Sequence, residues 1–340
     1  MRRPLVASAV AVALAGSIAG CGSTTTSAPS PSTSSVSAGA GGSAGAPARS
    51  TAPPGPAALS LHVRVLPMRL PASVAREAVI GQGRYAVVAG GMVAGDSSTA
   101  SSFLFDTEHP RTTPQPSLTV PVHDTAGALA GRTPLVIGGG NAAEQSVVQA
   151  WDGTAWHVIG HLPQARSDLV AAAVGGRVVV LGGYDGTRPA EPDILASTDG
   201  RTWATIGRLP LPVRYAASAV ADGAIWLFGG ERSGVMQRAV QRVDPATGRA
   251  AVVAHLPTPL GHAVAMTIGD RILLAGGRTG ASSSTDRMWW FDPSTDRLTP
   301  AGRLPVAITD SAVAQRGDTA FLLGGESPGV TDRVIEIDAR

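Results

Sequence analysis

Six pairs of adjacent glycines, repeated at nearly equal intervals, constrain the fold of this 340-residue chain more than any other feature. Each pair ends a short apolar run, and the spacings between the first glycines are 48, 44, 47, 47 and 48 residues. Periods of this length are typical of architectures in which each repeat is one supersecondary unit. The first glycines of the pairs are Gly90, Gly138, Gly182, Gly229, Gly276 and Gly324.

Each period contains four short segments that we interpret as β-strands, because they are bounded by turn residues and lack a helical stripe. The first is rich in small residues, as in residues 171–174, which suits strands that converge on a crowded axis. The second is the apolar run, whose glycines allow positive φ or a close approach of another backbone. The third ends in an Asp that begins a turn, and the fourth follows that turn. These aspartates are Asp106, Asp152, Asp199, Asp244, Asp292 and Asp338.

The sequence therefore predicts an all-β fold over residues 59–340, a six-bladed β-propeller with four-stranded antiparallel blades. After Gly324 the chain has room for a third strand, at residues 334–337, and not for a fourth. The alternating segment 59–66 can supply the missing strand. We expect this N-terminal strand to pair in the last blade and close the ring, which leaves no open sheet edge.

Glycine-pair repeats of this length, each followed by an Asp-bearing strand, resemble kelch repeats, and the resemblance covers residues 59–340. It implies a member of the galactose-oxidase-central-domain-like superfamily without the copper site, since that site needs a Cys linked to a Tyr. The only cysteine here is Cys21, far from the repeats. The kelch tryptophan of the fourth strand is clear at Trp156 and Trp203. Residues 197–203 also resemble an Asp-box of sialidase propellers, which we interpret as a hairpin turn.

The first 58 residues differ sharply from the rest. Two arginines come before an apolar run over residues 5–19. The end of this run is part of Ile18-Ala19-Gly20-Cys21, which resembles the lipobox of bacterial lipoproteins. The resemblance implies a signal peptide over residues 1–20, a lipid on Cys21 and an anchor at the outer face of the cytoplasmic membrane. Residues 22–58 are almost entirely Ser, Thr, Ala, Gly and Pro, so we predict a disordered tether over residues 21–58.

Charge excludes some partners. Without the two arginines of the signal peptide, 25 basic and 25 acidic residues remain, and the chain contains no lysine. Because no basic block is interleaved with aromatic residues, we expect no nucleic-acid partner. We also expect no cofactor and a monomeric propeller.

Counting back 14 residues from each first glycine gives one residue per blade, at the start of the innermost strand. We predict that these residues form a ring at the mouth of the central channel, where a concave polar surface suits a ligand. They are Arg76, Asp124, Asp168, Tyr215, His262 and Asp310. The loops after the glycine pairs should add the charged residues Asp96, Glu144, Asp185, Arg188, Glu191, Glu231, Arg232, Arg278, Asp286 and Glu326.

The sequence shows no recognisable catalytic set, so we predict a binding or scaffold protein whose mouth takes a protein or a cell-envelope glycan. An alternative is a sugar mutarotase or epimerase resembling the six-bladed sialic acid mutarotases, whose acid–base chemistry needs a carboxylate or His near an Arg. Sialidase chemistry needs an arginine triad and a tyrosine nucleophile, which three scattered tyrosines do not visibly provide. Three ring aspartates and His262 are possible cation ligands, but without a metal-binding spacing we expect solvated polar groups and no metal.

Overall fold

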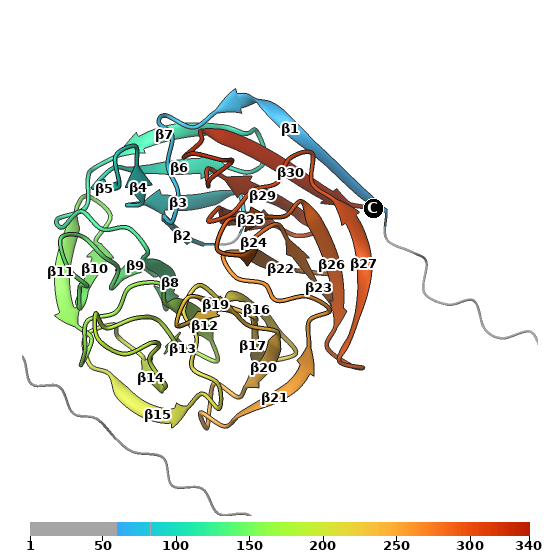
Figure 1. The fold of residues 1–340 in the computed structure, drawn as a ribbon. Helices are drawn as coiled ribbons and strands as arrows, with labels where there is room; N and C mark the ends of the chain where they lie inside the picture. The colour runs from blue at the N-terminus through green and yellow to red at the C-terminus, as the bar shows by residue number, and fades with distance from the viewer. Residues whose placement is uncertain (1–59, 82) are drawn as a thin grey trace, which may run out of the picture. The chain divides into compact units, whose positions relative to one another are not determined.

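The computed structural model describes residues 60–81 and 83–340, and all regular elements within them are β-strands. Six four-stranded antiparallel sheets surround a central axis as the blades of a propeller (Figure 1). The predicted fold class is confirmed. The predicted signal peptide, the lipidated Cys21, the tether and residue 59 lie outside the described residues. Within those residues, no helix has the length and hydrophobicity that a membrane crossing requires.

The strands of the first five blades run outward from the axis in chain order. Blade 1 comprises β2 (Ala78–Ile80), β3 (Tyr85–Ala89), β6 (Ser102–Asp106) and β7 (Arg111–Gln115). Blade 2 comprises β8 (Ala126–Ala130), β9 (Thr133–Ile137), β10 (Val147–Trp151) and β11 (Trp156–His161). Blade 3 comprises β12 (Val170–Val174), β13 (Arg177–Leu181), β14 (Asp193–Ser197) and β15 (Ala204–Arg208). Blade 4 comprises β16 (Ala217–Ala221), β17 (Ala224–Phe228), β20 (Ala239–Val243) and β21 (Ala250–His255). Blade 5 comprises β22 (Val264–Ile268), β23 (Arg271–Ala275), β26 (Arg287–Asp292) and β27 (Arg297–Arg303).

Blade 6 joins the two ends of the propeller. Its strands from the axis outward are β28 (Ala312–Arg316), β29 (Thr319–Leu323), β30 (Arg333–Ala339) and β1 (Leu61–Arg69). Strand β1 lies antiparallel to β30, with Leu61 opposite Ala339, as Figure 1 shows at the edge of the ring. The predicted closure by the N-terminal strand is therefore confirmed. Strand β1 extends beyond the predicted end at residue 66, because an irregularity after Val65 lets Arg69 pair with Arg333.

The glycine pairs join each blade to the next. All twelve glycines have positive φ, and the N–H of the second glycine donates to a carbonyl at the start of the following blade. Gly139, for example, donates to the carbonyl of Arg166 at 2.7 Å. A Cβ on Gly138 would lie 2.5 Å from that same oxygen. The first glycine is therefore required for the close approach of two blades, in addition to the turn itself.

Apolar side chains fill the spaces between neighbouring blades. Trp226 of β17 is buried there. Trp289 and Trp290 of β26 point to opposite faces of their sheet, since successive residues of a strand alternate. Trp290 packs with Ile335 of blade 6, whereas Trp289 packs against the cluster that contains Trp226 of blade 4. Both tryptophans therefore hold blade 5 to its neighbours.

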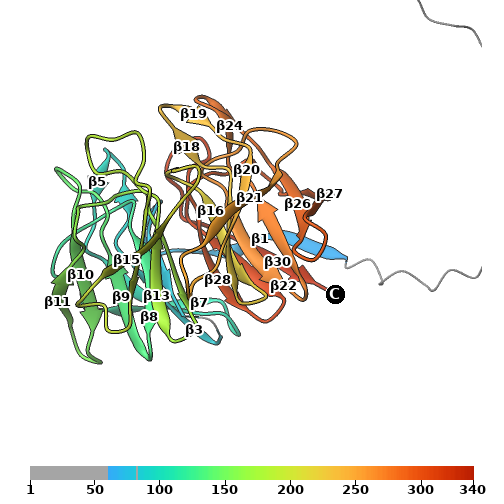
Figure 2. The same cartoon turned by 90° about the horizontal axis from the view of Figure 1, so that it is seen from below.

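One face of the propeller carries the starts of the innermost strands and the loops after the glycine pairs, and we call it the mouth face. Three short hairpins belong to these loops, β4 (Met92–Val93) with β5 (Ser97–Ser98), β18 (Glu231–Arg232) with β19 (Val235–Met236), and β24 (Arg278–Gly280) with β25 (Ser283–Ser284). Figure 2 shows β5, β18, β19 and β24 toward the same side.

Candidate functional site

The six predicted ring residues occupy equivalent places, each two residues before the innermost strand of its blade. All six have positive φ, between 51° and 60°. Five successive backbone hydrogen bonds of 2.8–3.1 Å link them around the axis, as where the N–H of Asp168 donates to the carbonyl of Asp124. A non-glycine residue in this left-handed region costs about 1 kcal/mol or more. Polar side chains are thus kept at six positions where glycine would be less strained.

The ring residues and the residues that follow them line one cavity of about 140 Å³, which we call the mouth cavity. Its lining residues are Arg76, Glu77, Asp124, Thr125, Asp168, Leu169, Tyr215, Ala216, His262, Ala263, Asp310 and Ser311. The structure therefore brings all six predicted site residues together. The cavity is smaller than the roughly 300–1,000 Å³ of clefts that enclose small-molecule ligands, so it suits one head group rather than a whole sugar.

Arg76 holds one side of the mouth cavity. Its Nη1 donates to Asp124 Oδ2 at 3.2 Å and to the hydroxyl of Tyr215 at 3.3 Å, and its Nη2 donates to Glu326 Oε1 at 2.9 Å. Burial alone would lower the pKa of Arg76, but the carboxylates of Asp124 and Asp310 raise it. The guanidinium is therefore charged and is paired with neighbouring carboxylates.

Two further arginines border the ring, Arg214 next to ring residue Tyr215 and Arg278 directly after the glycine pair of blade 5. Arg214 Nη2 lies 2.6 Å from Glu231 Oε1, and its Nη1 lies 3.4 Å from Asp168 Oδ2. Arg278 Nη2 donates to Glu326 Oε2 at 2.7 Å and to an oxygen of Asp310 at 3.1 Å. Each guanidinium thus connects a ring aspartate to a glutamate of a mouth-face loop.

His262 lies at the centre of a second group of contacts. Its Nδ1 is 2.7 Å from Asp310 Oδ1, its ring stacks on Tyr215 with centroids 3.9 Å apart, and its Nε2 reaches Glu231 Oε2 only at 3.5 Å. Burial would lower the pKa of His262, yet the hydrogen bond to Asp310 and the nearby carboxylate of Glu231 raise it. The nearby imidazole of His262, together with Arg214, also lowers the pKa of Glu231 to about 2. The group therefore favours an imidazolium between two carboxylates.

Several buried polar atoms of the mouth cavity have no hydrogen-bond partner among the residues that the structure describes. They are both carboxyl oxygens of Glu77, Oδ1 of Asp124 and Nε2 of His262. Burial raises the pKa of Glu77 to about 8, and burial together with Asp124 raises that of Asp168 to about 7. Burial also raises the pKa of Asp124, which Arg76 offsets only in part. Buried polar groups are normally satisfied, and these unpaired atoms are enclosed by the protein rather than exposed to the cavity.

Sequence reasoning missed three residues of this site, Glu77, Arg214 and His123, whose Nε2 lies 3.4 Å from Asp124 Oδ2. Glu77 follows ring residue Arg76, and the equivalent residues of the other blades are Thr, Leu, Ala, Ala and Ser. A single charged residue among small or apolar ones was a usable signal. Arg214 precedes ring residue Tyr215, and no sequence pattern indicates that its side chain turns toward Asp168 and Glu231.

Those charged loop residues predicted beside the mouth that form ion pairs divide into two groups. Glu231, Arg278 and Glu326 contact ring residues, as described above. Asp286 instead pairs with Arg303 at 2.7 Å, and Arg188 lies 3.4 Å from Glu191 within its own loop. The structure gives this second group contacts outside the ring.

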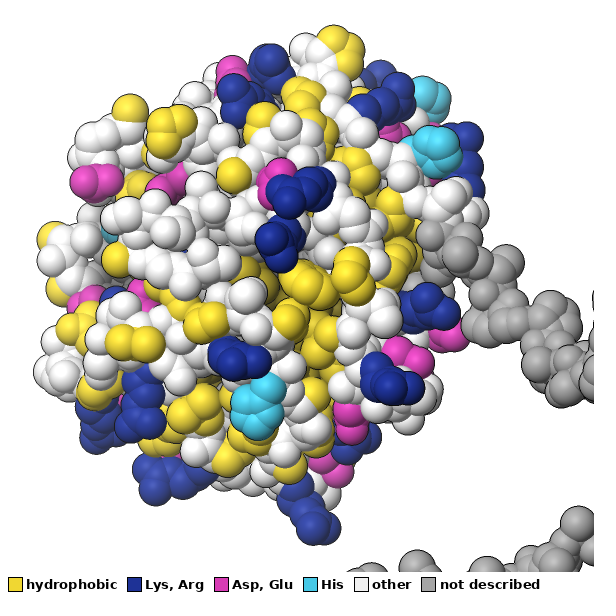
Figure 3. Space-filling view, turned by 45° about the vertical axis from the view of Figure 1, so that its right-hand side comes forward, with side chains coloured by type: hydrophobic (Ala, Val, Ile, Leu, Met, Phe, Trp, Pro, Cys, Tyr) yellow, Lys and Arg dark blue, Asp and Glu magenta, His cyan; other side chains and the backbone are white. Residues whose placement is uncertain are grey.

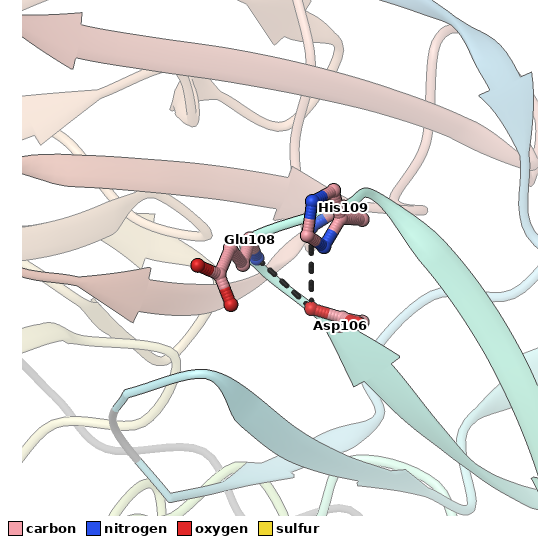
Figure 4. Close-up of side chains that lie close together, drawn as sticks. All are labelled: Asp106, Glu108 and His109. Carbon is pink, nitrogen blue, oxygen red and sulfur yellow. Dashed lines mark hydrogen bonds between the residues drawn. The ribbon is translucent and has the colours of Figure 1, made fainter.

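A cluster of three metal-ligand types lies on the opposite face, after β6 (Figure 4). Asp106 Oδ1 accepts the N–H groups of Glu108 at 3.1 Å and His109 at 3.2 Å, which forms a tight turn. Arg84 and Arg111 place guanidinium nitrogens 3.4 and 3.3 Å from the other Asp106 oxygen. These cations already neutralise the carboxylate, so the cluster is a turn rather than a metal centre. The same pair of turn contacts recurs at Asp152, Asp199 and Asp244, and the carboxylate of Asp292 accepts the first of them.

On the side of the propeller seen in Figure 3, arginine and acidic side chains are scattered among apolar and uncharged ones. The mouth cavity itself is lined by several charged groups.

A comparison with protein families matches residues 259–305, the whole of blade 5, to the Kelch motif. A comparison with curated proteins returned no match. The Kelch motif and the six-bladed architecture together support a kelch-repeat propeller. Such a propeller suggests a protein-binding or scaffold role.

Proposed function

We propose that this propeller is a lipid-anchored scaffold whose mouth face binds a protein partner outside the cytoplasmic membrane. The observation that carries the proposal is the ring of six polar side chains on strained backbone, with unpaired buried atoms around one cavity. Strain and unsatisfied polar groups are typical of sites kept for a ligand rather than for stability. The Kelch motif favours a protein as that ligand.

The hairpins of the mouth face can supply the rest of the interface. Val235, at the turn of the β18–β19 hairpin, is 61% exposed and follows the exposed Arg232. An exposed apolar residue beside an arginine is a favourable anchor in protein interfaces, where arginine and apolar contacts are enriched at the core. The mouth cavity and this hairpin together give the partner a polar and an apolar contact.

The experiment is a quantitative pull-down from cell-envelope extracts with the full chain and two variants. The first variant combines Val235→Asp with Arg232→Glu and changes the mouth face. The control variant is Tyr85→Asp, which changes an exposed residue at the start of β3, on the face opposite the mouth. We expect a partner that wild type and the control retain and the mouth variant loses by at least tenfold. Equal retention by all three proteins contradicts the proposal.

Two other readings of the mouth give different results. A cell-envelope glycan predicts binding on a glycan array with no protein retained. A mutarotase predicts faster anomer exchange of a free sugar by NMR, although the small volume of the mouth cavity does not favour it. Either result, without a protein partner, would replace the present proposal.

The anchor rests on the sequence alone, through the lipobox at Cys21. We expect an alkyne analogue of palmitate to label the wild-type chain in a bacterial host and to leave Cys21→Ala unlabelled. The wild type should fractionate with membranes. Labelling that persists in Cys21→Ala contradicts the anchor without affecting the mouth face.

A further inference from the structure

Ser98, His123 and Asp124 form a connected set of side chains beside the mouth cavity. Ser98 Oγ lies 2.7 Å from Nδ1 of His123, and Nε2 of the same ring lies 3.4 Å from Oδ2 of Asp124. One imidazole thus stands between a hydroxyl and a carboxyl group. A serine, a histidine and an acid in this order are the components of a nucleophilic serine site, which is recognised by its geometry rather than by positions in the sequence.

The backbone holds these three side chains together from two blades. Ser98 belongs to β5 of blade 1 and lies opposite Met92 of β4. His123 exchanges two backbone hydrogen bonds, of 3.0 and 2.6 Å, with Gly140, which directly follows the glycine pair of blade 2. Asp124 is the ring residue of blade 2. The set therefore rests on hydrogen-bonded backbone, which keeps reacting groups in position better than an irregular loop does.

Gly140 leaves one edge of the His123 ring uncovered. A Cβ on this glycine would lie 3.4 Å from Nε2 and 3.5 Å from Cε1 of His123, so a longer side chain would cover that edge. The residues at the equivalent position of the other five blades all have such side chains: Met92, Tyr184, Glu231, Arg278 and Glu326. The side chain of His123 is 17% exposed and Ser98 is half-buried. Both reacting groups therefore retain a surface that a small reactant can contact.

The acid influences which nitrogen of His123 carries the hydrogen. A carboxylate only accepts hydrogen bonds, so Asp124 favours a hydrogen on Nε2 and leaves the lone pair of Nδ1 facing Ser98. Arg76 Nη1, 3.2 Å from the same Asp124 oxygen, favours the carboxylate form of that acid. The Ser98 hydroxyl has two acceptors, Nδ1 at 2.7 Å and the carbonyl of Gly140 at 3.3 Å. The shorter contact directs its hydrogen to Nδ1, where His123 can accept it.

The chain contains two incomplete sets for comparison. Ser146 Oγ lies 3.2 Å from Nδ1 of His161, but no carboxylate is paired with this histidine in the described part of the chain. His157 Nε2 lies 2.8 Å from Asp152, but no serine donates to its ring within residues 60–81 and 83–340. The first set lacks the acid and the second lacks the nucleophile. Ser146 is therefore a built-in control for the effect of the acid.

We propose that Ser98 is a nucleophile toward small activated esters, with His123 as its general base and Asp124 as a positioning residue. Ser98 Oγ forms a bond to the carbonyl carbon while its proton passes to His123 Nδ1. The bond from that carbon to the alcohol oxygen breaks, and the alcohol leaves with the proton. Water attacks the acyl-serine by the same route, which releases one acid and restores the serine. This activity goes beyond the proposed binding function and does not depend on it.

An alkyne-tagged fluorophosphonate tests the nucleophile in the full chain. The reagent forms a bond from the serine oxygen to phosphorus and releases fluoride, and mass spectrometry locates the adduct. We expect Ser98 to react at least about tenfold faster than Ser146, whose histidine lacks the acid. Ser98→Ala should abolish the fast reaction, whereas Ser97→Ala, at the exposed neighbouring residue, should preserve it. His123→Gln should slow the reaction at Ser98 by about 100-fold or more, because it removes the general base.

The tautomer of His123 tests the role of Asp124 in the unmodified protein. Long-range proton–nitrogen correlation NMR, at a pH where the ring is neutral, distinguishes a hydrogen on Nε2 from one on Nδ1. We expect wild type to carry it on Nε2. In Asp124→Asn the amide can donate to Nε2, so the hydrogen should move to Nδ1 and labelling of Ser98 should slow by about tenfold or more. A merely structural role of Asp124 would leave the tautomer unchanged.

Turnover is measured with p-nitrophenyl acetate. We expect wild type to release one equivalent of p-nitrophenol in a rapid first phase and to form an acetyl adduct on Ser98, both absent from Ser98→Ala. Labelling of Ser98 no faster than that of Ser146, or a hydrogen on Nδ1 of His123 in wild type, would overturn the inference, and neither measurement requires a variant that folds. The pull-down variant at Val235 and Arg232 should label normally, so the binding function and the reactive serine can fail separately.

Discussion

His262 Nδ1 and Asp310 Oδ1, which belong to neighbouring blades, lie 2.7 Å apart, and both side chains are almost completely buried. Burial opposes ionisation of Asp310, yet the hydrogen bond from His262 lowers its pKa, just as Asp310 raises the pKa of His262. The two residues therefore form a buried ion pair. It connects blades 5 and 6 at the mouth, beside the stacked ring of Tyr215.

Asp310→Asn should lower the free energy of unfolding by about 3–5 kcal/mol, because removing one partner of a buried pair leaves the other charge uncompensated. The pKa of His262 should fall, which NMR titration of the imidazole measures. A raised histidine pKa stabilises the fold fully below the unfolded value and loses this contribution as pH rises through the folded value. The variant should therefore lose more stability at pH 5 than at pH 9.

The matched control for this pair is Asp152→Asn, since Asp152 lies 2.8 Å from Nε2 of His157 with both side chains about half exposed. An exposed pair contributes about 0–1 kcal/mol. Equal effects of Asp310→Asn and Asp152→Asn on unfolding would contradict the buried ion pair.

Glu77→Gln should stabilise the free protein at pH 8. The folded pKa of Glu77 is about 8 and its ordinary value is 4.5, so the folded state holds this proton more tightly. The contribution of Glu77 is therefore present below pH 4.5 and is lost as pH rises to 8, at up to about 1.4 kcal/mol per unit. Chemical denaturation should give similar stabilities at pH 4.5 and a more stable variant at pH 8. A variant less stable than wild type at pH 8 would show that Glu77 has structural partners.

The approach of neighbouring blades can be separated from the conformation of the glycine itself. Gly138 and Gly131 both have φ of +61°, but a Cβ on Gly131 meets nothing within 4 Å. Gly131→Ala should cost about 1 kcal/mol, from backbone strain alone. Gly138→Ala should cost at least 2 kcal/mol more, because the new methyl group meets the carbonyl of Arg166. Equal melting temperatures for the two variants would contradict the contact between blades.

The closure of the ring predicts a sharp effect of truncation. A chain that begins at Ser60 keeps β1 and should melt like the full chain. A chain that begins at Pro71 lacks β1, which exposes the edge of β30 to solvent and to other chains. We expect a lower melting temperature and concentration-dependent aggregation for the shorter chain, measured by calorimetry and light scattering. Indistinguishable behaviour of the two chains would contradict closure by β1.

The fold could be predicted because its information is repeated six times. A period of about 47 residues fixed the blade, and the count of residues after Gly324 revealed the missing strand that β1 supplies. The ring positions followed from the same repeat, since equivalent residues of a propeller share a distance from the axis. Side-chain partners do not repeat, so the contacts of Arg214 and the isolation of Glu77 could not be predicted from spacing.

The account of the mouth depends most directly on the burial of the Glu77 carboxyl. Its pKa can be measured by carbon-detected NMR in the free protein. The account predicts a pKa of about 8, because burial disfavours the carboxylate. A pKa near 4.5 would contradict it.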